Sequence, residues 1–492
     1  MAAIITEKFR VHNAKQFKED FGESASSTYI FIGRAHSWPI DTSPPTPVNG
    51  VSEEIDAWSD MTALKKVGSA DVSHGLTRYD WATGTSYDEY AADYSATNTS
   101  PATAATSLFA SRFYVMTSDY NVYKCIRTGR HSTSRAVQPS TVEPTGTSST
   151  LIYTTSDANC GTTGYQWKYM YTVTASDTIK FVTNDFIPVK TLGVQTEIDG
   201  QNGGLNATYA DDGSAQWDVE NDAVDGAVYH AIVTNAGSGY NNGDGAYEGV
   251  PIVGDGSGGV CTVHVSGGAL THITVTTAGT GYKRAQVIIA TTTTGLSGIG
   301  GGSNAIVKCI ISPVIGHGAD LIQELGGNHV IVNSRLEFGE GSGDFPTDND
   351  FRRIGLVQDP FAVGDTEVSA LASMAAYHQM TLSSVAGLEV DDTIGNANAN
   401  GTGVAVSRII SITGTVVSHI PIANSAGDFA NFVSTNSIYK DATGSSLGTV
   451  SSVNAAFPEV EKYSGQILYI ENRGAVTRAA DQIEDIKLII EM

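Results

Sequence analysis

The sequence predicts a mainly β protein with few short helices, in which a discontinuous framework resembling a β-sandwich or barrel carries two inserted all-β domains. The chain has 53 glycines and 41% hydrophobic residues, but only 16% charged residues. This composition is typical of a folded, turn-rich chain. Strand-like runs recur along the sequence, and one strand pattern is repeated. At 492 residues the chain exceeds what one core supports, so about three domains are expected.

The N-terminal framework is expected to cover residues 1–195. A helix that begins at Ser52 would have acidic residues in its first turn and Lys65 and Lys66 in its last turn, which suits the helix dipole. The expected elements are a strand over 4–11, a helix over 14–21 that ends at Gly22, a strand over 29–33, a proline-rich excursion over 39–47, and the helix over 52–66.

Residues 84–106 have little periodicity and are expected to form a long surface loop that is functional or contacts a partner. A meander of strands is expected over 112–189. Within it, the run YQWKYMYTV places four aromatic residues on one strand face. Such a face is either a core or a stacking and partner surface. The four residues are Tyr165, Trp167, Tyr169 and Tyr171.

An internal repeat marks the first predicted insert, residues 196–315. The run AIVTNAGSGY at 231–240 returns as ITVTTAGTGY at 273–282, and each copy continues with a β-branched run, a glycine-rich turn and another strand. Because two copies are too few for a solenoid, the repeat predicts one compact β domain. The framework is expected to continue over 316–361, with a short helix at 320–325 closed by glycine and two strands.

The second predicted insert covers 362–458 and contains alternating strands with glycine and asparagine turns. Residues 459–492 are then expected to complete the framework with a terminal strand pair over 466–471 and 483–491. In the second run Ile486, Leu488 and Ile490 share one face, as in a half-buried strand. The sheet partner of this pair must lie upstream, since unpaired backbone amides are costly when buried.

Charge and cysteine content exclude several classes of function. The net charge is −24 and no basic run is present, which argues against a nucleic-acid partner. The four cysteines lie far apart without metal-ligand spacing and are expected to be reduced, as in cytoplasmic synthesis. No apolar stretch reaches membrane-span length and the N-terminal residues MAAIITEKFRV have no signal-peptide pattern, so we expect a soluble chain without a membrane partner.

No motif supports chemistry. Gly254, Gly256 and Gly259 satisfy GxGxxG, but a strand-like run follows where a dinucleotide site needs a helix. Gly444, Ser446 and Gly448 match GxSxG by chance, because no helix-forming run follows. The histidines lack zinc spacing, and the acidic pairs lack the spacing of a calcium loop. Paired carboxylates for glycan cleavage stay open because their spacing is set in three dimensions. We therefore expect no enzyme activity, no cofactor and no small-molecule substrate.

An ordered series of motifs resembles the baseplate wedge subunit, gene product eight, of T-even-type contractile-tailed bacteriophages. The motifs cover about half of the chain, and the two predicted inserts do not match the family pattern. In chain order the matching residues are Thr6, Lys8, Phe9 and Arg10, FIGR at 31–34 with Trp38, VYKCI at 122–126, GYQWKYMY at 164–171, FIPV at 186–189, DFRRIGLVQDP at 350–360, and SGQILYIENR followed by DQIEDIKLI near the C-terminus.

The resemblance implies a structural component of the virion tail that is assembled in the host cytoplasm. It also implies a homodimer that binds neighbouring wedge proteins, the counterparts of gene products six, seven and ten, and takes part in the rearrangement before sheath contraction. A receptor-binding or decoration protein and a glycan-cleaving enzyme are the alternatives. The candidate framework or interface residues are Arg10, Arg34, Trp38, Trp167, Tyr169, Arg352, Tyr469, Asn472 and Arg473.

Overall fold

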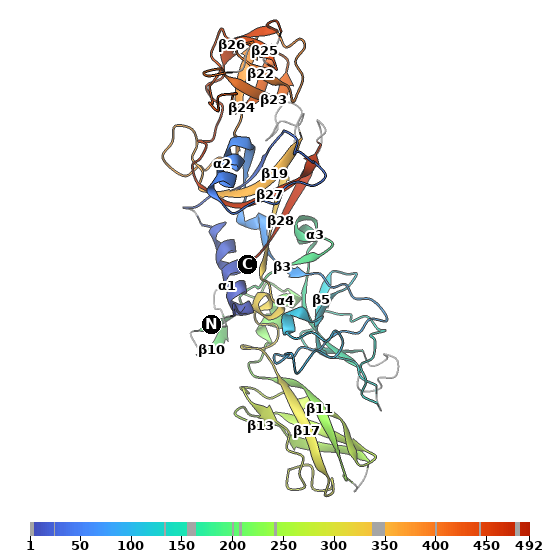
Figure 1. Cartoon of the computed structure of the whole chain (residues 1–492). Helices are drawn as coiled ribbons and strands as arrows, with labels where there is room; N and C mark the ends of the chain where they lie inside the picture. The colour runs from blue at the N-terminus through green and yellow to red at the C-terminus, as the bar shows by residue number, and fades with distance from the viewer. Residues whose placement is uncertain are drawn as a thin grey trace. The chain divides into compact units, whose positions relative to one another are not determined.

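A computed structural model shows a chain built mainly of strands, with five short α-helices among the described residues, which confirms the predicted mainly β class (Figure 1). The chain divides into two compact units. Unit 1 comprises 1–14, 73–330 and 490–492, and unit 2 comprises 15–72 and 331–489. The structure describes residues 4–23, 25–131, 134–154, 164–198, 201–205, 209–240, 244–336, 350–398, 401–441, 444–477 and 483–492.

The first element differs from the prediction, because residues 4–11 form no strand. Instead α1 (Glu7–Asp20) begins at Glu7, and the Thr6 side chain accepts a hydrogen bond from the Phe9 amide at 3.3 Å. This cap and the acidic Glu7 stabilise the helix start. Ile4 is 87% exposed, so its apolar character reflects no buried strand face.

The helix predicted over 52–66 is half helix and half strand. α2 (Val51–Asp60) ends at Asp60, and the chain continues as β2 (Met61–Lys66). Residues 61–64 are all buried, and β2 pairs with β1 (Thr28–Gly33) on one side and β20 (Ser373–Ala375) on the other. A strand covered on both faces needs a continuous apolar run, and this explains why the segment is not a helix.

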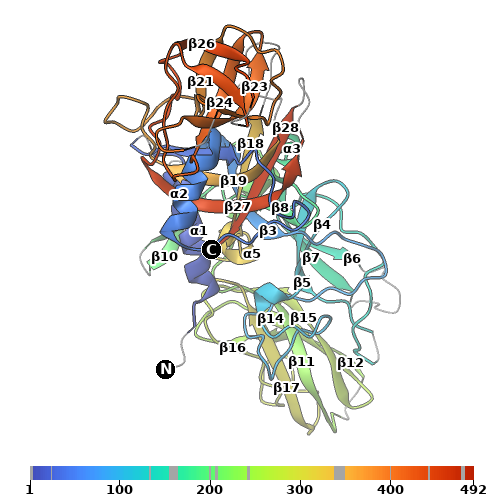
Figure 2. The ribbon, with the colours of Figure 1, turned by 45° about the horizontal axis from the view of Figure 1, so that its top comes forward.

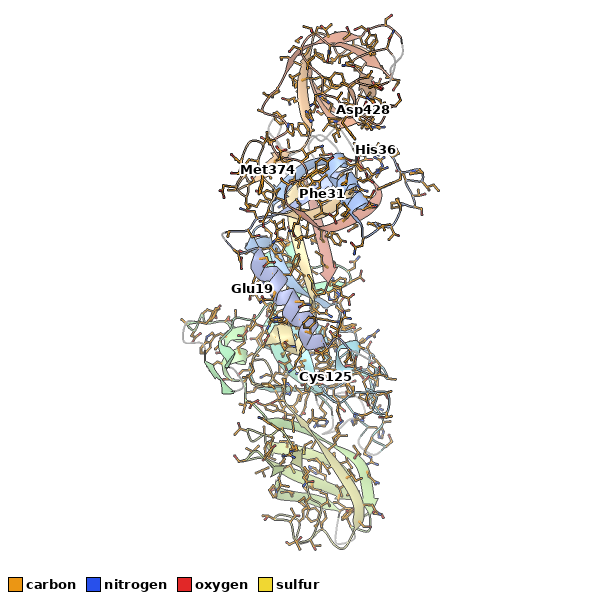
Figure 3. All side chains as sticks on the ribbon, turned by 60° about the vertical axis from the view of Figure 1, so that its left-hand side comes forward. Glu19, Phe31, His36, Cys125, Met374 and Asp428 are labelled. Atoms are coloured by element: carbon orange, nitrogen blue, oxygen red, sulfur yellow. The ribbon has the colours of Figure 1, made fainter. Side chains whose placement is uncertain are left out.

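The central sheet of unit 2 has the order β20-β2-β1-β19-β27, with β19 (Phe351–Gln358) and β27 (Gln466–Val476) completing it. β27 lies beside β19 in Figure 2 and pairs with it antiparallel. The core on this sheet includes Phe31 and Met374, both labelled in Figure 3. β20 belongs to this sheet although it lies within the segment predicted as the second insert.

The terminal strands are not a pair. β27 pairs with β19, whereas β28 (Glu484–Glu491) is a sheet neighbour of β18 (His329–Leu336). Residues 472–474, which follow the strand predicted over 466–471, lie inside β27. The expectation of an upstream partner is confirmed for both strands. Ile486 and Leu488 are buried, as the alternation predicts.

A closed six-stranded barrel in unit 2 has the order β21-β24-β23-β22-β25-β26 and its own apolar core (orange and red in Figure 1). The chain enters it at Tyr377 and leaves it at Phe457, whose rings stack with centroids 5.4 Å apart. The barrel strands are β21 (His378–Leu382), β22 (Thr393–Gly395), β23 (Val406–Thr413), β24 (Val416–Ile422), β25 (Ser437–Lys440) and β26 (Gly448–Val453).

In unit 1 a sheet of order β4-β5-β7-β6 lies between two apolar clusters. A separate pairing joins β3 (Val72–Thr77) to β8 (Phe186–Val189), and β9 (Gln195–Ile198) pairs with β10 (Gln201–Leu205). The sheet and helical elements are β4 (Tyr114–Met116), β5 (Asn121–Arg127), β6 (Leu151–Thr154), β7 (Tyr165–Thr172), α3 (Ala175–Phe181), α4 (Ala215–Asn221), α5 (Leu321–Leu325), and the 3-10 turns Ser69–Asp71 and Leu108–Ala110.

The loop predicted over 84–106 contains no named strand or helix, but it is not simply a surface loop. Residues 87–91 are buried, including the carboxylates of Asp88 and Glu89. The predicted short helix is confirmed as α5, which ends at Gly326 in the left-handed conformation with φ 82°. That conformation suits glycine, which lacks a Cβ.

The two copies of the repeat adopt the same local structure. Gly237 and Gly239 have φ of 62° and 82°, and Gly279 and Gly281 have φ of 65° and 74°. In each copy a Cβ on the first of these glycines would meet the ring of the following buried tyrosine, Tyr240 or Tyr282, at less than 3 Å. The close approach of glycine backbone and tyrosine ring therefore explains the AGxGY pattern.

The repeat copies also exchange partners. The first strand of copy one, β11 (Val228–Ser238), pairs with the last strand of copy two, β17 (Ser303–Ile311). The first strand of copy two, β15 (Ala269–Thr277), pairs with β14 (Val260–Ser266) from copy one. Both tyrosines lie in one shared core. The remaining strands are β12 (Gly245–Pro251), β13 (Val253–Gly254) and β16 (Ala285–Gln286).

Candidate functional site

Four of the nine predicted residues meet in unit 2, where a turn after β1 begins the assembly. Arg34 has φ 56°, and its amide donates to the Asp60 carbonyl at 2.9 Å. Its guanidinium pairs with the Asp60 carboxylate at 3.0 Å and lies 3.6 Å from the ring centroid of Trp38. This cation–π contact places Arg34 flat against the indole. We call Arg34, Trp38, Arg352, Arg353 and Asn472 the Trp38 cluster.

Trp38 fastens the segment after β1 to the sheet. Its indole Nε1 donates to the Arg473 carbonyl on β27 at 3.0 Å, and its amide donates to Asp41 at 2.7 Å. Asp41 also accepts two hydrogen bonds from Arg352 on β19, both at 3.0 Å. These bonds from Arg352 lower the pKa of the Asp41 carboxyl. A bidentate arginine pair of this kind fixes orientation as well as distance.

Arg353 and Asn472 complete the Trp38 cluster. Arg353 donates to the Asn472 side-chain oxygen at 2.9 Å and pairs with Glu53 of α2 at 2.7 Å. Asn472 in turn donates to the Pro45 carbonyl at 3.1 Å. Sequence reasoning missed Arg353, Glu53 and Asp41, although Arg353 stands in the matched run DFRRIGLVQDP. Two adjacent arginines in an otherwise apolar strand were the available signal, because such residues need buried partners.

The other five predicted residues lie elsewhere. Arg10 in unit 1 pairs with Glu491 at 3.1 Å and donates to the Met492 carbonyl at 3.2 Å. Tyr469 on β27 bonds Glu471 at 3.1 Å, and burial raises the pKa of its hydroxyl to about 12. Neither residue joins the Trp38 cluster. The side chain of Arg473 is also outside it, because only the Arg473 carbonyl contacts Trp38.

Trp167 and Tyr169 lie in the core of unit 1, with exposed fractions of 0% and 2%. The Trp167 ring stacks on Tyr165 with centroids 5.4 Å apart. All four aromatics are buried in core clusters, so the core alternative is correct, although they do not share one face. Tyr171 packs in a different cluster, because the pairing of β7 with β5 shifts register between Tyr169 and Tyr171. Such a bulge reverses the side that later residues face.

A second charged cluster, the Lys124 cluster, lies inside unit 1 and consists of Lys124, His317, Glu324 and Tyr90. The Lys124 ammonium forms an ion pair with Glu324, lies 2.6 Å from His317 Nδ1, and is 3.6 Å from the Tyr90 ring centroid. Its side chain is 0% exposed. Glu324 also accepts from the Gly318 amide at 2.6 Å.

Burial and pairing shift the pKa values in the Lys124 cluster in opposite senses. Burial lowers the pKa of Lys124 to about 8 and that of His317 to about 4, so the imidazole is neutral at pH 7. Burial alone would raise the pKa of Glu324, but Lys124 and His317 outweigh it and lower that pKa to about 2. The pair is therefore ionised at neutral pH, with its charge enclosed by protein.

The two glycine motifs that were considered as a dinucleotide site and as a nucleophile site form turns. The glycines of GxGxxG lead into β14, and those of GxSxG lead into β26, so neither opens a helix. Among the residues that the structure describes, no group of three His, Cys, Asp or Glu could hold a metal ion. Cys125, Cys261 and Cys309 are free thiols, whereas Cys160 lies outside the described residues. No helix in the described part of the chain is long and apolar enough to span a membrane.

Fold and site together define a β-rich protein in which buried arginines, acids and aromatic rings fasten distant chain segments to one another. Residues 3–210 match the family model Phage-Gp8, described as bacteriophage T4 Gp8. The match covers 208 of the 492 residues, so the similarity to this family concerns less than half of the chain. No curated protein matches the chain.

The matched segment does not contain the whole site. It includes Arg10, Arg34, Trp38, Trp167 and Tyr169, whereas the four remaining predicted residues lie beyond residue 210. The Trp38 cluster therefore joins side chains of the matched segment to β19 and β27, which the match does not cover. The resemblance of these two strands to the family stays a prediction from their sequence motifs.

Proposed function

We propose that the protein is a structural component of the baseplate wedge that forms a homodimer and links neighbouring wedge proteins. Its neighbours would be the counterparts of gene products six, seven and ten. It would assemble with them in the host cytoplasm and take part in the rearrangement before sheath contraction, without enzyme activity. The observation that carries this proposal is the match of residues 3–210 to the Gp8 family.

The Trp38 cluster supports a linking role because it holds an apolar segment in place at the surface of unit 2. Ile40 is 62% exposed, and Val48 and Val51 are 68% and 69% exposed. Asp41 fastens the start of this segment to Arg352, Pro45 fastens its middle to Asn472, and its last residue, Val51, begins α2. Exposed apolar residues on a fixed segment are suited to docking a partner. We propose residues 40–51 as a contact for a neighbouring wedge protein.

We also propose that residues 196–315 and 362–458 are domains inserted into a framework formed by 1–195, 316–361 and 459–492. Separate apolar cores within the two inserts support this division, although β20 in the second insert pairs with β2 of the framework. In this proposal the inserts extend the contacts with neighbours or decorate the outer rim, whereas the framework carries the contacts common to the family.

The proposal is tested by native mass spectrometry of the full chain, alone and after co-expression with the neighbouring wedge proteins. We expect a dimer alone and a larger complex with the neighbours. The double variant Ile40→Asp, Val51→Asp should keep the dimer and lose the larger complex. A matched control is the double variant Phe429→Asp, Val433→Asp, which places the same two charges on apolar residues that are 62% and 58% exposed outside residues 40–51.

Two results would contradict the proposal at different levels. A stable trimer that ignores the neighbours would favour a receptor-binding protein and overturn the wedge assignment. A complex that survives the double variant but not the control would leave the wedge assignment intact and remove residues 40–51 as the contact.

A further inference from the structure

Two histidines face each other across neighbouring strands of the closed barrel in unit 2. His378 on β21 is the direct partner of His419 on β24 in the antiparallel pairing, and Figure 2 shows these strands within the barrel. The two imidazole rings stack with centroids 5.7 Å apart and an interplanar angle of 27°. The Phe432 ring meets His419 edge-on at 5.5 Å. His419 is therefore in contact with one further imidazole and one apolar ring.

The surroundings of this histidine pair disfavour a positive charge. His419 is only 3% exposed, and its Nδ1 has no hydrogen-bond partner in the described part of the chain. A charged imidazole donates from both nitrogens, so protonation would leave a buried N–H without an acceptor. Burial and then the charge of Lys462 lower the pKa of His378 to about 4. Burial, His378 and Lys462 lower the pKa of His419 to about 3, so both rings are neutral at pH 7.

The acidic side chains on the neighbouring elements have other partners or are exposed. The strands β21, β24 and β26 contain no charged residue apart from the histidines. Among the described residues no carboxylate forms an ion pair with either imidazole. Lys462, which donates to the Ser59 carbonyl at 3.2 Å, is a positive group that acts on both rings. The neighbouring pairs are Glu53 with Arg353, Asp60 with Arg34, Asp391 with Arg408 and Asp392 with Lys440; Glu459 accepts from the Ala375 amide, and Glu54, Asp56, Asp428 and Glu461 are exposed.

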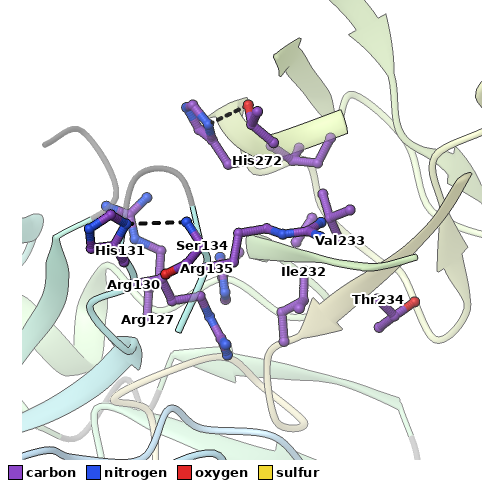
Figure 4. A pocket seen from close by; sticks show the side chains of 13 residues that line it. Arg127, Arg130, His131, Ser134, Arg135, Ile232, Val233, Thr234 and His272 are labelled. Carbon is purple, nitrogen blue, oxygen red and sulfur yellow. Dashed lines mark hydrogen bonds between the residues drawn. The ribbon is translucent and has the colours of Figure 1, made fainter. Parts of the chain in front are cut away.

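A histidine of unit 1 shows the opposite arrangement. His230 lines the pocket in Figure 4, and its Nε2 lies 3.3 Å from the carboxylate of Glu89. A proton taken up by His230 would therefore meet a negative counterion. In the barrel a proton taken up by His378 or His419 would meet a second imidazole and the ammonium of Lys462. The histidine pair of the barrel is thus the arrangement in which protonation is most opposed by the folded state.

We propose that His378 and His419 make the barrel acid-sensitive, because their protonation loosens the pairing of β21 with β24. Two charged rings in contact repel each other, and water can solvate both only when the strands separate locally. The ordinary pKa of both groups is 6.5, and folding lowers it. Their neutral contact is therefore fully stabilising above pH 6.5 and is progressively lost as the pH falls toward about 4. The inference does not depend on the wedge proposal.

Hydrogen–deuterium exchange of the full chain at about pH 7 and about pH 5, read by mass spectrometry of its peptides, tests the proposal. After correction for the intrinsic pH dependence of exchange, amides of β21 and β24 should exchange faster at the lower pH. The expected acceleration is roughly twentyfold for each histidine that is protonated on opening. Amides of β2 and β19, in the central sheet of the same unit, should change far less. His419→Phe keeps a planar ring without a titrating group and should reduce the acceleration by roughly twentyfold.

A second variant and a control separate this effect from general acid damage. His378→Gln changes the less buried histidine and should give a similar reduction, so the test does not depend on one variant. At about pH 7 both variants should protect β21 and β24 as well as the unchanged chain does. His36→Gln is the matched control, because it removes a partly buried histidine of unit 2 outside the barrel and should leave the acceleration intact. Acceleration that persists in both barrel variants, or that is equal in β19, would overturn the proposal.

Discussion

The Trp38 cluster and the Lys124 cluster solve the same problem in different ways. Each cluster brings cationic and acidic groups from distant parts of the chain into contact in a largely buried position. The acids that pair with the arginines of the Trp38 cluster keep contact with solvent, as the 34% exposed side chain of Asp41 shows. In the Lys124 cluster the ammonium is fully enclosed and its carboxylate partner is only 3% exposed. The first cluster fastens surface segments, whereas the second lies within the core.

This difference predicts how the stability of the protein responds when a charged residue of each cluster is substituted. Breaking a partly solvated ion pair lowers the free energy of unfolding only a little, because water solvates the group that has lost its partner. A fully enclosed pair leaves an uncompensated charge when one member is removed. Loss of a charge in the Lys124 cluster should therefore destabilise the whole unit, while losses in the Trp38 cluster should loosen chain segments locally.

The largest effect is expected for Glu324→Gln. This variant leaves the Lys124 ammonium buried without its carboxylate, and we expect the free energy of unfolding to fall by about 3–5 kcal/mol. Urea denaturation followed by intrinsic fluorescence measures the change. The double variant Lys124→Met, Glu324→Gln removes both charges and should recover much of the loss. A single variant within about 1 kcal/mol of the unchanged chain would show that the enclosed pair is not critical.

Trp38→Ala should cost about 3 kcal/mol, because a large and mostly buried ring is removed. The variant also deletes the hydrogen bond to the Arg473 carbonyl and the surface on which Arg34 lies. We expect faster proteolytic cleavage within residues 39–50, measured by mass spectrometry of the fragments. Uniform cleavage along the chain would instead indicate that Trp38 supports the whole fold.

Acid should weaken the Lys124 cluster. The pKa of Glu324 falls from an ordinary 4.5 to about 2 on folding, so its contribution is complete above pH 4.5 and is lost as the pH falls toward 2. Between pH 6 and pH 3 this group should account for a loss of about 2 kcal/mol in the free energy of unfolding. Urea midpoints at the two pH values measure the change. In Glu324→Gln the pH dependence should be smaller; an unchanged slope would assign it to other carboxyls.

Arg352→Lys is expected to have the smallest effect, about 1.5 kcal/mol, since the positive charge stays while the bidentate geometry is lost. Arg352→Lys should also raise the pKa of Asp41, which the hydrogen bonds from Arg352 lower. Denaturation and carboxyl titration by NMR measure the two effects. A loss as large as that of Glu324→Gln would remove the distinction between the clusters.

Local patterns predicted many elements but not their partners. The alternation in β28 and the glycine after α5 are properties of a few adjacent residues, and both predictions are confirmed. The pairing of β27 with β19 joins residues more than a hundred positions apart. Local patterns therefore predicted both terminal strands but paired them wrongly with each other. The prediction extended the helix α2 through β2, because an apolar run alone does not distinguish a helix from a strand that is buried on both faces.

The site was predicted to a similar extent. Residues of the Trp38 cluster stand in the motifs that resemble the family, so the sequence named most of them without their contacts. The Lys124 cluster joins positions 200 residues apart, and no local pattern connects them. A lysine at the centre of the apolar run VYKCI was the one available signal, since a buried ammonium requires a partner. The identity of that partner depends on the tertiary fold.

The stacked rings of Tyr377 and Phe457 have a consequence for evolution. Because the chain enters and leaves the barrel at touching positions, the barrel strands form a cassette whose removal leaves two ends that are already adjacent. A recombination event that exchanges residues 378–456 between two homologous chains would preserve the spacing of the sheet on either side. Such an exchange would replace the whole barrel in a single genetic step.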